Sequence, residues 1–298
     1  AKEESIETIL SSVQAKEEGL IDKLYVIGCL SERYADELRE EIPEVDQYFG
    51  VRDISGVVRE LCGEWRDDLS TTRVQTTPDH YAYLKIGEGC NWHCAYCAIP
   101  RIRGGHRSRP MANVVKEARH WVEQGVKEIN LIAQDTTYYG MDKWEQKADK
   151  TSGVDSSRGE SLAGLLRELN AIPGDFWIRV LYTHPAHWSR ELIDTFAQCE
   201  KVVKYVDIPL QHIADHILDE QRRKTDGDYI RQLIRDIRAA VPGIGLRTTF
   251  ISGLPGETEE DHAELRDFVR EFRFERAGVF AYSKEEGTLA AKMKAQVH

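Results

Sequence analysis

Short apolar runs alternate with longer amphipathic stretches along most of the chain. Runs rich in Val, Ile, Leu and aromatic residues predict strands at residues 23–28, 81–87, 127–133, 176–182, 204–210, 245–252 and 277–283. Between them, apolar positions three and four residues apart predict helices, most clearly at residues 113–125, 161–172, 189–199, 228–241 and 257–272. This alternation is typical of a largely parallel sheet built from βα units.

Six of these strands follow residue 81, two fewer than a complete eight-stranded barrel has. We therefore expect an α/β fold in which residues 75–298 form a partial (β/α)6 TIM-like barrel. Residues 1–74 hold a separate βα pattern and end in a polar stretch that is typical of a linker. Two units are expected.

Composition narrows the class of protein. The chain is 41% hydrophobic and 31% charged, as ordinary globular proteins are, and no run approaches the roughly 18 apolar residues of a membrane span. Its first residues resemble an amphipathic helix rather than a signal peptide, so we expect a cytoplasmic protein and no membrane partner. The net charge of -11 disfavours nucleic acid as a partner and slightly favours a basic protein.

Three of the six cysteines, Cys90, Cys94 and Cys97, lie within one short loop after the first barrel strand. In barrels of this kind, the loops at this end of the strands build the active site. In a chain without an export signal, clustered thiols more often serve metal or redox chemistry than disulfides. Three thiolates on one loop can hold an iron-sulfur cluster and leave one iron without a protein ligand.

A zinc site is the main alternative for this loop, because structural zinc takes four ligands and a histidine can complete the set. The histidines near enough in sequence are His80, His93 and His106. Simple burial of the thiols is the remaining alternative. Cys62 and Cys199 are expected to be small buried residues in helices.

The spacing C-x3-C-x2-C resembles the signature of the radical S-adenosylmethionine enzymes, whose fold is a partial α/β barrel. The segments "CAIPRIRGGHRSRP", "LIAQDTTYYG", "DIPLQH", "LRTTFISGLPGETEEDH" and "YSKEEGT" together resemble the methylthiotransferases of that superfamily. Within them, the resemblance is to the RimO-type branch, which modifies a ribosomal protein. It covers nearly all of residues 80–290.

The resemblance implies that Cys90, Cys94 and Cys97 bind a [4Fe-4S] cluster whose open iron chelates S-adenosyl-L-methionine. One electron then cleaves the sulfonium to a 5'-deoxyadenosyl radical. Tyr96 is implied to pack against the adenine, although a lone aromatic is more often simply buried.

The resemblance also implies a second [4Fe-4S] cluster, held in the family by three cysteines of the first domain. Cys29 matches the last of the three, and no cysteine precedes it in this chain. Residues 1–74 would then be the C-terminal part of that domain with a linker, and the second cluster is expected only in the intact protein. The family's small C-terminal β-barrel (TRAM-like) domain is expected to be absent as well.

Further candidates stand at the ends of other barrel strands. Gln134 and Asp135 follow the second barrel strand, where an amide or a carboxylate can accept a hydrogen bond from the ammonium group of the cofactor. Asp135 is equally well explained as a strand-end cap. Gly253 follows the fifth barrel strand, where glycine lets the backbone approach a ligand, or merely permits a sharp turn.

Several other polar residues are expected near the same mouth. They are Arg101, Arg103, Arg107, Arg109, Asp207, Gln211 and His212. The arginines offer cations for a carboxylate or a phosphate, but any one of them also fits a solvated loop. His212 is more often a structural histidine than a proton shuttle. Gln221 stands where the family pattern has methionine, and we expect it on a helix away from the cysteine loop.

The resemblance implies a radical S-adenosylmethionine methylthiotransferase that modifies the β-carbon of an aspartate in a small-subunit ribosomal protein. Besides this substrate it implies a reductant protein as partner. No catalytic side chain is assigned. Two alternatives remain open: a methylthiotransferase acting on an adenosine of transfer RNA, and a non-catalytic module that binds zinc or an iron-sulfur cluster.

Overall fold

The structure is a computed structural model that describes residues 2–64, 74–149 and 151–297. The chain divides into two compact units, Ala1–Ser70 with Arg101–Gly104, and Thr71–Pro100 with Gly105–His298. The assignment of residues 1–74 to part of a methylthiotransferase N-terminal domain stays a prediction.

The first unit is a small α/β layer. Its elements are α1 (Lys2–Glu17), β1 (Tyr25–Ile27), α2 (Cys29–Arg33), α3 (Ala35–Glu41), β2 (Gln47–Phe49) and α4 (Ile54–Cys62). Strands β1 and β2 pair in parallel, and Ile9 and Val13 of α1 pack with Leu38 and Tyr48 in one apolar cluster. The sequence pattern did not predict β2, because only two apolar residues, Tyr48 and Phe49, mark it and polar residues precede them.

The second unit is built on parallel strands. They are β3 (Tyr81–Lys85), β6 (Glu128–Ile132), β7 (Trp177–Val180), β8 (Tyr205–Asp207), β9 (Gly245–Ser252) and β10 (Arg276–Ala281). Two three-stranded sheets, β3-β6-β7 and β8-β9-β10, are linked by a parallel bridge between Ile178 and Val202. A short antiparallel pair, β4 (Gly87–Glu88) with β5 (Arg107–Ser108), stands beside them.

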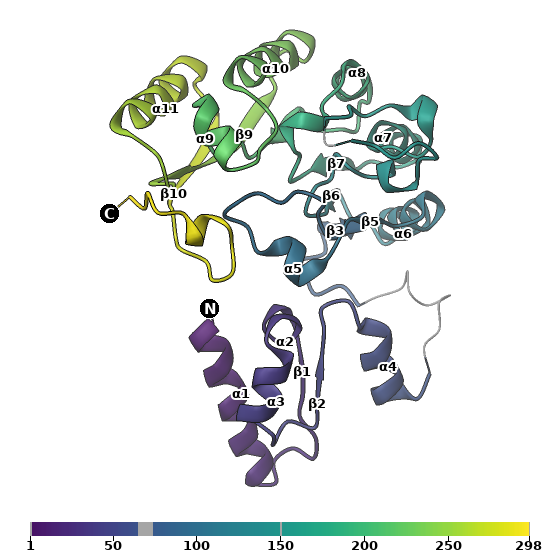
Figure 1. Ribbon diagram of the computed structural model, residues 1–298. Helices are drawn as coiled ribbons and strands as arrows, with labels where there is room; N and C mark the ends of the chain where they lie inside the picture. The colour runs from purple at the N-terminus through teal and green to yellow at the C-terminus, as the bar shows by residue number, and fades with distance from the viewer. Residues whose placement is uncertain (1, 65–73, 150, 298) are drawn as a thin grey trace. The chain divides into compact units, whose positions relative to one another are not determined.

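Helices connect successive parallel strands. They are α5 (Ile99–Arg103), α6 (Met111–Glu123), α7 (Leu162–Asn170), α8 (Arg190–Gln198), α9 (Asp215–Glu220), α10 (Gly227–Ala240) and α11 (Glu259–Phe272). In Figure 1, α6, α7, α8, α10 and α11 follow one another along the outer side of the strands. Side chains cap the first backbone N–H groups of four of these helices, from Ser161, Ser189, Asp226 and Thr258.

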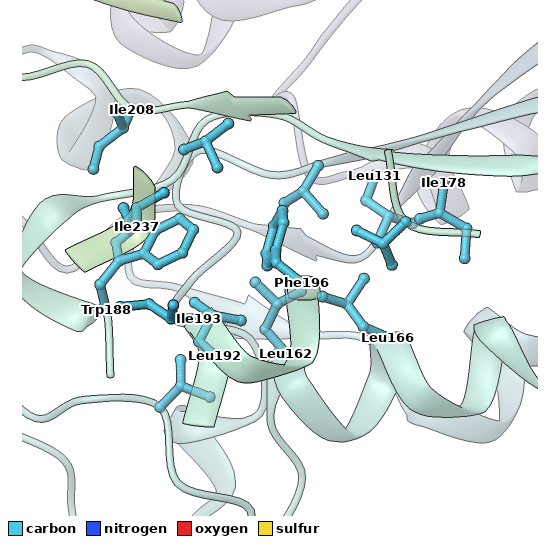
Figure 2. Close-up of a cluster of buried hydrophobic side chains, with 14 of the residues drawn as sticks. Leu131, Leu162, Leu166, Ile178, Trp188, Leu192, Ile193, Phe196, Ile208 and Ile237 are labelled. Carbon is cyan, nitrogen blue, oxygen red and sulfur yellow. The ribbon is translucent and has the colours of Figure 1, made fainter. Parts of the chain in front are cut away.

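The core lies between these helices and the strands. Figure 2 shows Leu162 and Leu166 of α7 and Phe196 of α8 close to Leu131 of β6 and Ile178 of β7. All five side chains are almost completely buried. Because the inner faces of α7 and α8 are apolar and their outer faces polar, both helices can only cover the sheet in this orientation.

The predicted fold class is confirmed: an α/β unit with six parallel strands that do not close into a barrel within the described residues. Strand β9 has the predicted bounds, and the other predicted strands and helices differ at their ends by up to three residues. Among the described residues, no helix is long and apolar enough to cross a membrane.

Candidate functional site

A cavity of about 460 Å³ opens beyond the carboxyl ends of β3, β6, β7 and β8. Residues from four separate strand-to-helix connections and from the turn between α9 and α10 line it: Cys90, Trp92, Cys94, Tyr96, Cys97, Ile99, Ala133, Gln134, Tyr182, Thr183, His184, Pro209, Gln211 and Arg223. We call it the cysteine cavity. The three predicted cluster cysteines, Tyr96 and Gln134 thus come together as the sequence pattern implied.

Two lining residues hold an uncommon backbone conformation. Tyr182 and Gln211 have positive φ angles of 59° and 75°. A non-glycine residue in this region is strained, and such strain concentrates at functional sites where surrounding structure holds it in place. The backbone carbonyl and amide of Gln211 pair with Ile251 and Thr249, which fixes the strained turn against β9.

The cysteine loop is fastened by backbone hydrogen bonds to distant segments. Gly89 N donates to Gln134 Oε1 at 2.7 Å. Ala95 N donates to the carbonyl oxygen of Gln221 at 3.1 Å, and the carbonyl oxygen of Ala95 accepts from Ala290 N at 2.8 Å. The loop is therefore positioned by the rest of the second unit and not only by its own turns.

All three thiols are free and at least half-buried. Burial and the nearby Asp135 carboxylate raise the pKa of Cys90 to about 12, and burial raises the pKa of Cys97. Without a metal, the thiols of Cys90 and Cys97 thus keep their protons at neutral pH, and any metal or cluster that binds these two thiols must displace protons.

Arg223 is the cation of the cavity. It is only 5% exposed, and Nη1 donates to Cys94 Sγ at 3.5 Å and to the Tyr96 hydroxyl at 3.4 Å. Nη2 donates to the carbonyl oxygen of Pro209 at 2.7 Å, while the buried Nε has no partner. A guanidinium cannot lose its proton in a protein, so a fixed positive charge lies against one of the three thiols.

The Tyr96 hydroxyl accepts a hydrogen bond from the same guanidinium nitrogen that contacts Cys94. Burial raises the pKa of the Tyr96 hydroxyl well above the ordinary value, and the charge of Arg223 opposes this only in part. The phenol therefore stays neutral, and its ring is part of the cavity wall.

Asp135 is a direct hydrogen-bond partner of Trp92. Its carboxylate accepts hydrogen bonds from Trp92 Nε1 at 2.9 Å, from the Thr137 hydroxyl and from Tyr138 N, and lies 3.5 Å from His187 Nε2. It lines a second cavity, of about 560 Å³, together with Trp92 and His187. The structure thus places Asp135 as a support of Trp92, outside the lining of the cysteine cavity.

Trp92 separates these two cavities and lines both of them. Its indole stacks on the imidazole of His184, with ring centroids 3.7 Å apart and planes 14° apart. Burial, and after it the charge of Arg223, lowers the pKa of His184 well below its usual range. A neutral imidazole and an indole therefore form one flat wall of the cysteine cavity.

Gly253 and Cys29 lie outside the lining of the cysteine cavity. Gly253 has a φ of 80°, and its N–H donates to Glu257 Oε2 at 2.6 Å, so the glycine is explained by a turn before α11. Cys29 begins α2 in the first unit and is exposed. Their predicted roles in binding the cofactor and a second cluster stay predictions.

Most of the remaining predicted polar residues form hydrogen bonds or ion pairs that stabilise the fold. Arg109 pairs with Glu117 and donates to the carbonyl oxygen of Lys85. Asp207 accepts from Tyr182 N at 3.2 Å, and His212 Nδ1 accepts from Ala214 N at 3.1 Å. Of the seven polar residues expected at the mouth, only Gln211 is among the lining residues, and none of the four arginines is.

Three features were missed or misjudged from the sequence. Cys62 was expected to be buried, but its thiol is exposed at the end of α4. Arg223 was not predicted as a site residue, because "QRRKT" reads as a solvated basic run. The expectation that Gln221 lies away from the cysteine loop is wrong: its carbonyl accepts from Ala95 N. Its side chain is buried without a hydrogen-bond partner for either polar atom. Position relative to the loop depends on how the chain turns after α9, which local periodicity does not encode.

Comparison with known proteins agrees with this geometry. The family model described as the radical SAM superfamily matches residues 84–269, which span the cysteine loop and most of the parallel strands. Solved structures share the fold at low identity. The cobalamin-dependent S-adenosylmethionine radical enzyme OxsB has a TM-score of 0.62 and 13% identity, covering 97% of this chain and 44% of that chain. The methyltransferase TsrM from Kitasatospora setae has a TM-score of 0.54 and 18% identity, covering 70% and 39%.

Fold and site together define a radical S-adenosylmethionine protein. Curated relatives narrow the class: the ribosomal protein uS12 methylthiotransferase RimO of Akkermansia muciniphila is 56% identical over all of this chain and 70% of its own length. The RimO of Opitutus terrae is 50% identical, over all of this chain and 68% of its own length. The chain therefore belongs to the RimO family of the radical SAM superfamily, and membership implies a [4Fe-4S] cluster and S-adenosylmethionine.

Proposed function

We propose that the protein is a radical S-adenosylmethionine methylthiotransferase that modifies ribosomal protein uS12, at the β-carbon of an aspartate. The observation that carries the proposal is the meeting of Cys90, Cys94 and Cys97 in one cavity of a chain that is 56% identical to a RimO. A reductant protein is the second partner that this function needs. Neither nucleic acid nor a membrane is proposed as a partner.

The residues of the cysteine cavity fit a [4Fe-4S] cluster. Three free thiols line it, and a buried guanidinium with an unpartnered Nε lies beside them. Such a cluster carries its ligands on different irons, so its cysteines need not converge on one point. Among the described residues, no group of three His, Cys, Asp or Glu is arranged to hold a metal ion. When bound, the cluster and S-adenosylmethionine supply the radical that removes hydrogen from an unactivated carbon.

In this proposal the side chains of the cysteine cavity bind and orient the cofactor and shield the reacting groups from water. We propose that Gln134 and Tyr96 contact the cofactor, since both line the cavity beside the cysteines. Gln134 Oε1 accepts a hydrogen bond from Gly89 N, which fixes the side-chain amide beside the cysteine loop. Ile99, Ala133 and Pro209 add apolar wall, which keeps water from the reacting groups.

Three further site residues remain part of the proposal in other ways. Asp135 orients Trp92 through a 2.9 Å hydrogen bond, and Gly253 shapes the turn next to β9. Cys29 is the proposed ligand of a second [4Fe-4S] cluster, for which the family resemblance implies two further cysteines of the first domain.

Metal analysis tests the cluster first. After anaerobic reconstitution, the protein should hold about four iron and four acid-labile sulfide per cysteine loop. Cys94→Ala should lose them, and Cys62→Ala, which removes an exposed thiol from α4, should keep them. About one zinc without sulfide would mean a structural zinc site and would end the proposal.

Substrate choice needs a second experiment. The protein with its reconstituted cluster is incubated with uS12 and with transfer RNA, and both products are weighed. Added mass on uS12 alone is expected. A heavier transfer RNA with unchanged uS12 would instead assign the protein to the sister reaction on adenosine.

A further inference from the structure

We infer that Arg223 is a positioning residue for the cluster: its guanidinium donates a hydrogen bond to the Cys94 thiolate, strengthens cluster retention and raises the reduction potential of the cluster. The inference rests on the proposed cluster site of the previous subsection and goes beyond it, because it assigns a role to a residue outside the cysteine signature.

The backbone on both sides of Arg223 has an uncommon conformation that turns the Arg223 side chain into the protein. Arg222 and Lys224, its two neighbours, have positive φ angles of 60° and 58°. Both neighbours are exposed, whereas Arg223 is 5% exposed. The left-handed conformations of these two flanking residues cost on the order of 1–3 kcal/mol each. The fold thus maintains a strained turn after α9 that directs one of three consecutive basic side chains into the cysteine cavity.

The contacts of Arg223 leave its charge without a counter-ion. Its donors reach a thiol, a phenol and a carbonyl oxygen, and no carboxylate forms an ion pair with it among the described residues. A buried cation is unfavourable unless it is paired. Three thiolates around a cluster would supply the missing negative charge, and Nη1 already lies 3.5 Å from Cys94 Sγ.

Charge and hydrogen bonding to the sulfurs are two of the quantities that set the potential of an iron-sulfur cluster. One-electron reduction makes the cluster more negative, so a fixed cation beside Cys94 favours the reduced form. A ligating thiolate that accepts a charge-assisted hydrogen bond is also held in place, as ligands of other metal sites are by their outer partners.

The chain offers a matched control for the test. Arg223→Gln removes the buried charge, and Arg222→Gln removes an equal charge from the exposed neighbour one position earlier. Arg223→Lys keeps a positive charge but not the planar fork that reaches three acceptors. For each variant we would measure iron and sulfide content, the midpoint potential against dithionite with mediators, and the melting temperature of the cluster-free protein.

The expected result has three parts. Arg223→Gln should retain less cluster than Arg222→Gln. Any cluster it keeps should show at least a tenfold smaller equilibrium constant for one-electron reduction, about 59 mV more negative. The shift in Arg223→Lys should be smaller. Cluster-free Arg223→Gln should melt no lower than the parent, because the substitution removes an unpaired buried charge.

Three results would overturn the inference while leaving the cluster site standing. One is a potential and cluster content equal to those of Arg222→Gln. A second is a normal potential with weakened S-adenosylmethionine binding only, which would make Arg223 a partner of the cofactor carboxylate. A third is a cluster-free Arg223→Gln that melts well below the parent, which would make Arg223 a structural residue. A parent protein that holds zinc and no sulfide would instead remove the proposed function, and the inference with it.

Discussion

Single polar residues of the second unit show how one signal in the sequence can have two explanations. Asp135 follows a barrel strand, where a carboxylate can contact a cofactor, yet its acceptors are filled by Trp92, Thr137 and Tyr138. The hydrogen-bond partners of a carboxylate are decided by the loops that meet it in space, so the residue type alone could not distinguish a ligand from a support.

If Asp135 supports Trp92, Asp135→Asn should destabilise the cluster-free protein. The amide keeps the shape but turns an NH2 group toward one of the donors, which leaves buried groups unsatisfied and costs about 1–3 kcal/mol. Urea denaturation of the cluster-free protein measures the change. The control is Asp175→Asn, whose side chain is 95% exposed and should shift stability by less than about 0.5 kcal/mol. Equal stability of the two variants would contradict the supporting role.

The lowered pKa of the Glu257 carboxylate should make the stability of the folded protein depend on pH. Burial alone would raise the pKa of this carboxylate, but the nearby His212 and the backbone N–H groups of Leu254 and Gly253 lower it below the ordinary 4.5. A group whose folded pKa is lowered contributes stability that is present above the unfolded pKa and lost as pH falls through the folded pKa. The difference in free energy of unfolding between the parent and Glu257→Gln, here called the stability gap, should therefore be constant near neutral pH. It should shrink below about pH 4.5.

Chemical denaturation at a series of pH values between neutral and acid measures this gap. Glu259→Gln, in the exposed first turn of α11, is the control that removes a charge without touching the Gly253 turn. A Glu257→Gln gap that stays unchanged into acid would show that the carboxylate charge contributes nothing to the turn.

At the scale of elements, connections matter as much as helices and strands. The link from β6 to α7 passes through Gly140, whose φ is 81°, and a Cβ there would collide with the backbone of Glu160. Gly243, in the turn before β9, has a similar φ of 79° but open space around it. The two glycines separate the cost of backbone conformation from the cost of a collision.

Gly243→Ala should lose roughly 1–2 kcal/mol, the price of a left-handed alanine. Gly140→Ala should lose a further 1–3 kcal/mol or so, since the chain must shift to relieve the overlap. Thermal unfolding of both variants measures the difference. If Gly140→Ala were no worse than Gly243→Ala, the close approach to Glu160 would not constrain the loop.

At the scale of the whole molecule, the long periodic elements and the strands within apolar runs could be predicted, whereas the short strands β2, β4 and β5 could not. Strand β9 and helix α11 carry eight and fourteen residues of clear pattern. The pairs β4 with β5 and β1 with β2 have only two or three residues per strand, and their pairing comes from tertiary context.

The site divides in the same way. The proximity of Cys90, Cys94 and Cys97 could be predicted from the sequence, because few residues separate them on one loop. Arg223 could not be predicted, since its burial depends on the sign of φ at Arg222 and Lys224, which are ordinary basic residues in sequence. Arginine and lysine have no intrinsic preference for the left-handed conformation, so the local sequence does not indicate positive φ angles at these positions.

The parallel-stranded core should dominate the stability of the second unit. Leu166 is fully buried between α7 and the sheet (Figure 2), so Leu166→Ala should cost about 2–5 kcal/mol. Val279 on the edge strand β10 is 63% exposed, and Val279→Ala should cost less than about 1 kcal/mol. Denaturant midpoints compare the two, and similar losses would refute the proposed position of the core.

The fastening of the cysteine loop has a consequence for the order in which the protein matures. Its anchors, Gln134, Gln221 and Ala290, are supplied by segments that follow it far along the chain. Contacts between distant segments form late, because closing long loops is entropically costly. During synthesis the chain would therefore present three thiols in an unfixed loop until the segment around Ala290 has folded. If the loop holds the proposed cluster, insertion of the cluster would follow that step, and oxidation of the thiols would do most harm before it.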